Sequence, residues 1–415
     1  MSFKPNFVTL KNMQKTEAYI VDALRTPVGR YGGILKDVRP DDLSALAIKT
    51  LVERTGIASD AINDVMWGCA NQAGEDNRNI GRMALLLADL PYAIPGTTIN
   101  RLCGSSLDAI NQAARAVWSG DASLLIAGGV ESMTRAPYAI PKNVSGKALF
   151  GNLTAYDTAL GWRFPNPAMK KKFPLESMGE TAENIYEKYK ITREDQDAFA
   201  LESHRRAVQA QESGYFKNEI VPVEIPQKKS DPLVIEKDEG PRKDTTIEKL
   251  ATLPPAFRKG GTVTAGNSSA LNDGAACILI ANEDTIKKYN LSPVAKIIAT
   301  GTAGVDPRYM GLGPVPATQH ALKKANVSLN NIDIIELNEA FAVQSLAVMK
   351  DLGLEHERTN INGGAIALGH PLGCSGARIM TTLLYIMQRK NSHYGLATMC
   401  IGVGQGIATI IERVS

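Results

Sequence analysis

The chain has 415 residues, a formal net charge of +3 at neutral pH, 44% hydrophobic residues and 21% charged residues. This length predicts about two or three domains, and the composition is ordinary for a globular protein with a sizeable core. The small net charge excludes the broad basic face of a nucleic-acid-binding protein, although a local basic pocket for phosphates remains open.

The cysteines and the two ends of the chain bear on the cellular compartment in which the protein is expected. The five cysteines, at positions 69, 103, 277, 374 and 400, form no CxxC pair, which argues against a disulfide framework or a structural zinc site. No stretch approaches the roughly 18 apolar residues of a membrane span. Residues 1–15 lack the apolar core of a secretory signal, and the last residues are not a peroxisomal address. We therefore expect a cytoplasmic protein with free thiols, no metal and no membrane span.

Short apolar runs predict buried strands, and stretches with helical spacing lie between them. In chain order, we expect a strand over 18–22, helices over 42–55 and 104–119, strands over 124–127 and 277–280, a helix over 316–326, a strand over 333–337, a helix over 375–389 and a strand over 399–401. Strands that alternate with helices indicate an α/β protein with buried sheets.

The chain also repeats a pattern of elements. Residues 46–68 and 320–341 both read as helix, short linker and strand. Later in each half, an Ile-Asn pair (99–100 and 361–362) opens a glycine-containing turn, a helix and a strand. This order predicts a duplicated α/β unit with a site between the copies, although any α/β protein can give partial matches of this kind.

A long insertion interrupts the repeat. Residues 136–260 have little periodicity at first, and residues 177–211 then read as two helices, with Thr192 as the N-terminal cap of the second. We therefore expect an N-terminal half at 17–135, completed by about 261–285, an insertion at 136–260 that covers the α/β body, and a C-terminal half at 286–415.

Cys103 is the first candidate for chemistry, because small residues and then a helical pattern follow it. A thiol at a helix N-terminus loses its proton more easily, and the backbone N–H groups there can hold a developing oxyanion. The alternative is a small buried core cysteine.

His370 and Cys400 are candidates of the same kind. His370 lies in a glycine-rich stretch where the backbone can approach a ligand, and it could take the proton of Cys103; the alternative is a histidine satisfied by turn backbone. Cys400 ends a strand and could act as an acid and base, or simply pack there. Cys374 is expected to pack at a helix start. The glycines after Cys400 do not spell GxGxxG, which excludes dinucleotide binding.

Asn338 and Glu339 end the strand predicted over 333–337. The carboxamide of Asn338 could hold a water molecule or a carbonyl oxygen; the alternative is a helix cap.

Taken together, six segments resemble the motifs of the thiolase family, in that family's order, over roughly residues 17–414. They are NRLCGSS (100–106), GGVESMTRAP (128–137), TVTAGNSSALNDGAA (262–276), ELNEAFA (336–342), GGAIALGHPLGCSGAR (363–378) and CIGVGQG (400–406). The resemblance implies a five-layered αβαβα fold, two similar halves plus a loop domain, and usually a homo-oligomer, either a dimer or a dimer of dimers.

The resemblance also implies roles for single residues. Cys103 would be the nucleophile that forms an acyl-enzyme, and His370 would activate it and contribute to an oxyanion hole. Cys400 would move the proton at the α-carbon of acetyl-CoA, and Asn338 would orient a water molecule in that hole. The N–H groups of Cys103 and Gly402 would form a second hole. The implied reaction is CoA-dependent thiolysis of a 3-oxoacyl-CoA, or the reverse Claisen condensation.

No permanently bound cofactor is implied, since coenzyme A and acyl-CoA are substrates. The residues implied along coenzyme A are Met178, Ser269, Ala340 and Phe341, with Arg242 at the nucleotide end.

Residues 68–91 and 157–170 are similar to those of 3-oxoadipyl-CoA thiolases of aromatic degradation. That substrate ends in a carboxylate, for which Arg163 and Lys170–Lys172 are candidate partners; the alternative is a solvated basic loop.

Three alternative functions also have to be considered. Short-chain biosynthetic thiolases, which form acetoacetyl-CoA, usually carry His where this chain has Ser177. Ketoacyl synthases share the fold but lack a second cysteine such as Cys400. A non-catalytic acyl-CoA or lipid-binding module would have lost the nucleophile, whereas Cys103 is present.

Overall fold

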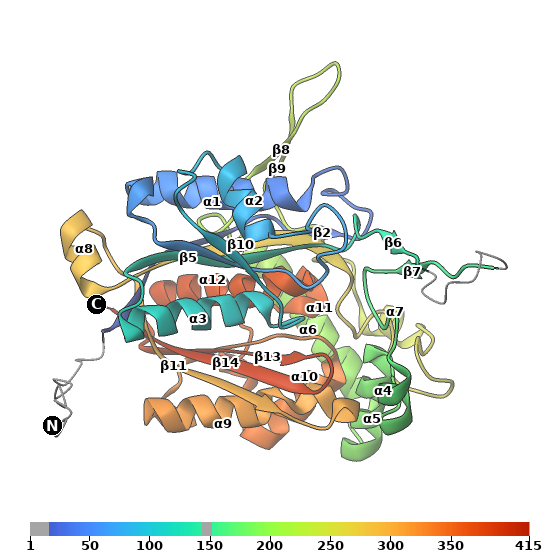
Figure 1. Cartoon of the computed structure of the whole chain (residues 1–415). Helices are drawn as coiled ribbons and strands as arrows, with labels where there is room; N and C mark the ends of the chain where they lie inside the picture. Colours follow the sequence, from blue (N-terminus) through green and yellow to red (C-terminus); the bar gives the residue numbers. More distant parts are fainter. Residues whose placement is uncertain (1–15, 143–151, 415) are drawn as a thin grey trace, which may run out of the picture.

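The computed structural model describes residues 16–142 and 152–414. Two β-sheets lie one above the other, with helices above, between and below them, which gives five layers (Figure 1). This arrangement confirms the predicted fold class. Among the described residues, none of the helices has the length and apolar character needed to cross a membrane.

The two sheets have matching strand orders. The first contains β4 (Gly96–Ile99), β3 (Asp64–Gly68), β5 (Leu124–Ser132), β10 (Asn272–Ala281) and β1 (Ala18–Arg25), with β2 (Gly29–Arg30) paired to β10. The second contains β12 (Ile334–Leu337), β13 (Tyr394–Ile401), β14 (Gln405–Arg413) and β11 (Ala295–Gly304). A short antiparallel pairing of β1 with β11 joins them, with Tyr19 opposite Lys296.

The repeat is visible in the strand pairings. In the first half β3 runs parallel to β5, which is antiparallel to β10, and β10 is antiparallel to β1. In the second half β12, β13, β14 and β11 show the same sequence of parallel, antiparallel and antiparallel pairs. The outer helices are α1 (Pro40–Thr55) and α2 (Ile80–Leu87) on one side and α9 (Pro314–Ala325) and α10 (Ala342–Leu352) on the other (Figure 1).

The middle layer contains α3 (Ser105–Ser119) and α12 (Leu372–Lys390), which pack against each other. A Cβ on Gly376 of α12 would collide with the backbone nitrogen of Leu107 of α3, so this approach requires glycine. The N–H of Ala377 also donates to Oγ of Ser106 at 2.9 Å. Cys103 lies two residues before α3 and His370 lies two residues before α12, so this contact joins the helix starts that follow them.

Four of the five predicted strands are longer than predicted, whereas β12 is one residue shorter, and β5 shows why strands were cut short. The prediction stopped at residue 127 because Gly128 and Gly129 follow, yet β5 continues to Ser132. A Cβ on Gly129 would collide with the carbonyl oxygen of Gly373 in the first turn of α12. The glycines therefore permit close packing of a helix on the strand, and they do not end it.

The segment between the halves contains the two predicted helices, α5 (Met178–Tyr189) and α6 (Arg193–Glu212). Oγ1 of Thr192 accepts a hydrogen bond from the N–H of Asp195 at 3.1 Å, which confirms the predicted cap. The remaining elements of this segment are β6 (Tyr138–Ala139), β7 (Tyr156–Asp157), α4 (Pro167–Lys172), β8 (Val223–Ile225), β9 (Leu233–Ile235) and α7 (Ile247–Ala251). Outside it lie α8 (Glu283–Tyr289) and α11 (Ala365–Leu368).

Candidate active site

Cys103 lies in a tight loop between β4 and α3. Oδ1 of Asn100 accepts from the N–H of Leu102 at 2.9 Å, and the hydroxyl of Ser105 donates to the carbonyl of Leu102 at 2.6 Å. Leu102 has a φ of 47°, which is unusual for a residue with a side chain. Cys103 is partly exposed, whereas the other four cysteines are buried. The loop therefore leaves part of Cys103 accessible to solvent.

The Cys103 thiol accepts backbone N–H groups from Gly402 and from Cys103 itself, yet burial raises its pKa to about 11. The predicted lowering of this pKa by a helix N-terminus is therefore wrong. Helix α3 begins only at Ser105, and the loss of water around the sulfur outweighs the two N–H groups. At neutral pH the free thiol is protonated, so a base must remove its proton.

Cys400 is the second-last residue of β13 and is fully buried. It packs in an apolar cluster with Met178, Ala340 and Phe341. Burial raises the pKa of its thiol, and the nearby Cys103 raises it further. The two thiols, which come from opposite halves of the chain, are therefore near enough to interact electrostatically.

The turn after β13 contacts the Cys103 loop directly. A Cβ on Gly402 would lie 3.3 Å from Cδ1 of Leu102, and one on Gly104 would lie 2.7 Å from Cδ1 of Ile401. Val403, the next residue of the turn, has a φ of 64°, which is an outlier for a β-branched residue. The strained turn and loop together place the N–H of Gly402 against the Cys103 sulfur.

His370 is held in a defined orientation between α11 and α12. Its backbone N–H donates to Oδ1 of Asn272 at 2.9 Å, and its ring Nδ1 lies 2.6 Å from Oγ of Ser375. Because the single hydroxyl proton of Ser375 is donated to the carbonyl of Pro371, we assign the imidazole proton to Nδ1. Burial, and then the positive charge of Arg378, lower the pKa of His370 to about 3, so the ring is neutral with an unprotonated Nε2.

Asn338 follows β12 and faces His370, with its Nδ2 3.4 Å from Nε2 of that ring. Its backbone N–H donates to the carbonyl of Thr398 on β13 at 3.0 Å. Helix α10 begins only at Ala342, so Asn338 is not a helix cap. Its buried Oδ1 has no partner among the described residues, so it can accept a hydrogen bond from a bound water molecule or substrate.

Four of the five residues implied along coenzyme A lie together. Met178 packs against the apolar cluster that contains Ala340 and Phe341, and both the backbone N–H and Oγ of Ser269 donate to the carbonyl of Ala340, at 3.0 and 3.1 Å. Arg242 is exposed in the loop between β9 and α7, where its backbone N–H donates to Nδ1 of His204 at 3.2 Å. Within the described part of the chain, no hydrogen bond or ion pair joins Arg242 to the other four residues.

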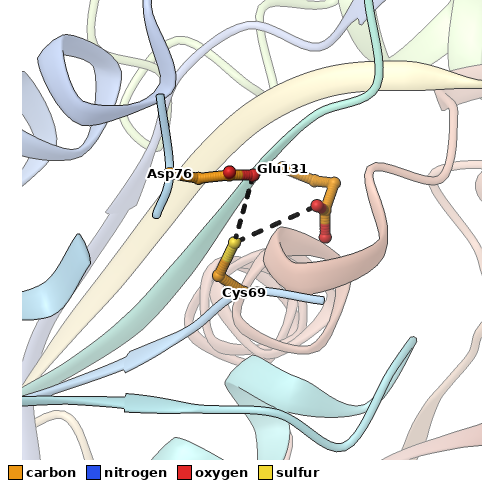
Figure 2. Close-up of side chains that lie close together, drawn as sticks. All are labelled: Cys69, Asp76 and Glu131. Carbon is orange, nitrogen blue, oxygen red and sulfur yellow. Dashed lines mark hydrogen bonds between the residues drawn. The ribbon is translucent and has the colours of Figure 1, made fainter. Parts of the chain in front are cut away.

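A buried cluster behind the site was missed by the sequence reasoning. Cys69, Asp76 and Glu131 lie together, with the Cys69 sulfur 3.7 Å from Asp76 and 4.0 Å from Glu131 (Figure 2). The Glu131 carboxylate also accepts the N–H groups of Ala70, Asn71 and Gly373, at 3.0, 3.1 and 2.8 Å. The carboxylate oxygens of the cluster thus already accept hydrogen bonds from the Cys69 thiol and from backbone N–H groups. We therefore interpret the cluster as a structural link between the segments that carry it, and call it the brace.

The brace joins β5, the loop after β3 and the first turn of α12, next to His370. Burial raises the pKa of Glu131 to about 7, although the backbone N–H groups oppose this rise. Glu131 is part of the GGVES motif, and its position at a strand end was the available signal.

Comparison with known proteins agrees with this geometry. Residues 18–284 match the N-terminal domain of thiolase, and residues 291–413 match the C-terminal domain. The chain therefore belongs to the thiolase family, which consists of acyltransferases that act on CoA thioesters.

Individual relatives are similar over nearly the whole chain. A beta-ketoadipyl-CoA thiolase of Acinetobacter baylyi is 56% identical and covers 96% of this chain and 99% of its own. A 3-oxoadipyl-CoA/3-oxo-5,6-dehydrosuberyl-CoA thiolase of Escherichia coli is 55% identical, over 96% and 100%. The structure of human mitochondrial 3-ketoacyl-CoA thiolase with CoA is 41% identical, with a TM-score of 0.90 over 96% and 98% of the two chains.

Proposed function

We propose that this protein is a 3-oxoadipyl-CoA thiolase, which cleaves its substrate with coenzyme A into acetyl-CoA and succinyl-CoA. The observation that carries the proposal is the Cys103 thiol, which accepts the N–H of Gly402 and lies beside Cys400. The names of the relatives at 56% and 55% identity support this substrate over other 3-oxoacyl-CoA esters.

The reaction begins at Cys103. Nε2 of the neutral His370 takes the thiol proton while the sulfur attacks the C3 carbonyl of the substrate. The N–H groups of Cys103 and Gly402, which already point at the sulfur, then hold the oxyanion of the tetrahedral intermediate. The intermediate collapses with cleavage of the C2–C3 bond, and a succinyl group remains on Cys103.

The departing acetyl-CoA enolate must be stabilised and protonated. A water molecule on Asn338, together with Nε2–H of His370, stabilises the enolate oxygen, and the unpartnered Oδ1 of Asn338 supports such a water site. Cys400 gives its proton to C2. Coenzyme A then loses its thiol proton to Cys400 and attacks the acyl group, and Cys103 recovers its proton from His370.

A substrate panel tests the proposal. The purified protein should cleave 3-oxoadipyl-CoA with a higher kcat/KM than acetoacetyl-CoA or 3-oxohexanoyl-CoA. Equal or better turnover of acetoacetyl-CoA would instead support a short-chain biosynthetic thiolase. No turnover of any 3-oxoacyl-CoA, with binding retained, would support a non-catalytic acyl-CoA-binding module.

The same proposal includes a cytoplasmic homo-oligomer, either a dimer or a dimer of dimers. Strand β4 lies at the edge of the first sheet, and the neighbouring α2 exposes Met83, Leu86 and Leu87, each with 41 to 48% of its surface accessible. An edge strand beside an apolar surface favours self-association. Light scattering coupled to size-exclusion chromatography should give at least twice the 44.6 kDa of one chain; a single-chain mass would contradict it.

A further inference from the structure

We propose that Arg163 binds the terminal carboxylate of the acyl chain and so selects a dicarboxylic acyl-CoA; this inference rests on the proposed function. Arg163 lies in the loop between β7 and α4, and its side chain is half-buried. Its Nη1 donates to the carbonyl of Thr158 at 2.9 Å, and its Nη2 donates to the carbonyl of Asn71 at 3.2 Å.

Among the described residues, Arg163 has neutral hydrogen-bond partners and no ion-pair partner. Within residues 16–142 and 152–414, no carboxylate lies within the 4.0 Å ion-pair distance of its guanidinium group. Neutral carbonyls occupy two of the roughly five N–H donors that a guanidinium carries. A half-buried cation with free donors is a good partner for a carboxylate, because arginine can bind both oxygens at once.

One contact of Arg163 connects it to the loop that carries Cys103. Its partner Asn71 directly follows Ala70, whose carbonyl accepts from Nδ2 of Asn100 at 3.0 Å. Oδ1 of Asn100 in turn accepts from the N–H of Leu102, the residue before Cys103. The carbonyl that holds the guanidinium therefore belongs to a segment bonded directly to the Cys103 loop.

The neighbouring Trp162 is bonded to a second segment near the site. Its Nε1 donates to the carbonyl of Glu176 at 3.2 Å, two residues before Met178. The sulfur of Met178 lies 3.5 Å from the position that a Cβ on Gly402 would take. The loop with Arg163 thus spans from the Met178–Gly402 side to the Asn71–Asn100 side of the same site.

The surroundings of Arg163 suit a short aliphatic chain that ends in a charge. Leu160, Trp162 and Phe164 flank it and are 45, 37 and 47% exposed. Such apolar side chains can cover the methylene groups, while the guanidinium takes the carboxylate. The rival cations Lys170–Lys172 are all exposed on α4, where water screens an ion pair and leaves it weak.

The test compares two substrates with the same number of acyl carbons, 3-oxoadipyl-CoA and the uncharged 3-oxohexanoyl-CoA. For R163Q, the ratio of their kcat/KM values should fall by about 30- to 100-fold, as expected for loss of a charged hydrogen-bonded pair. R163K keeps the positive charge but cannot bind both carboxylate oxygens at once, so the ratio should fall by a smaller factor, about five- to tenfold. K228Q, on the exposed hairpin between β8 and β9 (Figure 1), removes the same charge and should leave the ratio unchanged.

A loop-structuring role would give a different result, because R163Q would then slow both substrates by the same factor and the ratio would stay constant. That outcome would overturn the inference. If R163Q does not fold, the ratio for R163K decides. If the wild-type protein prefers 3-oxoadipyl-CoA and the Arg163 variants keep this preference, the role of Arg163 is refuted while the proposed function stands. A wild-type thiolase without this preference would refute the substrate proposal and the role of Arg163 with it.

Discussion

Nδ1 of His370 lies 2.6 Å from the hydroxyl of Ser375, and that hydroxyl donates its own proton to the carbonyl of Pro371. This pair of contacts assigns the proton of the imidazole to Nδ1, so Nε2, which faces Asn338, is unprotonated and can act as a base. Ser375 is thus a positioning residue for His370.

Replacement of Ser375 by alanine should release the imidazole. We expect S375A to lower kcat about tenfold or more, because the ring loses both its orientation and its tautomer preference, while KM changes little. S375T, which retains the hydroxyl, should recover most of the lost rate. Steady-state kinetics of both variants measure this; equal rates for S375A and the wild type would exclude the positioning role.

The pKa directions of Cys103 and His370 predict a simple pH profile in the free enzyme. A thiol pKa raised to about 11 means that the thiolate is a small fraction at neutral pH and grows about tenfold per pH unit. His370, with its pKa lowered to about 3, stays neutral throughout this range. Alkylation of Cys103 followed from pH 6 to 9 should therefore rise with a slope near one on logarithmic axes. A plateau below pH 8 would indicate a stabilised thiolate and contradict this description.

Cys400 should matter for the proton and less for the acyl group. In C400S, exchange of the α-protons of acetyl-CoA with solvent deuterium should slow by about 100-fold or more, because a hydroxyl is a far weaker acid than a thiol. Acetylation of Cys103 by acetyl-CoA should slow by less than tenfold. C374A, which changes a buried cysteine in the core, is the matched control and should retain exchange. Equal losses in both steps would argue against separate roles for the two thiols.

Gly376 should be essential for the middle layer. A Cβ there would collide with the backbone of α3 at Leu107, so we expect G376A to destabilise the fold by about 1–3 kcal/mol or more and to lower activity. G304A is the control, since its Cβ would make only an ordinary contact at 3.9 Å. Thermal unfolding of both variants tests this. A melting temperature for G376A equal to that of the wild type would show that the two helices can separate freely.

Periodicity and the repeat predicted the fold class, the helices α5 and α6 and the cap at Thr192, because these features depend on neighbours in sequence. Periodicity did not predict the full length of β5, since Gly129 is explained by close contacts with other segments, including Gly373, more than 240 residues away. The sequence could name Cys103, His370, Cys400 and Asn338 as candidates, but their roles remain a prediction.

Three features of the site lay beyond local patterns. The raised pKa of Cys103 follows from burial, which no spacing reveals. The partners of Glu131 and Asn272 come from the loop after β3 and from the start of α12, so they depend on how distant segments pack. Arg242 was placed beside coenzyme A by resemblance alone, and its exposed loop gives that placement no further support.

The most direct measurement of the central claim is the site of acylation. After brief incubation with acetyl-CoA, acid quenching and tryptic digestion, mass spectrometry should find one acetyl group on the peptide of residues 102–115, which carries Cys103, and C103A should carry none. Acetylation of Cys69, Cys277, Cys374 or Cys400 in place of Cys103, or turnover by C103A, would contradict the account.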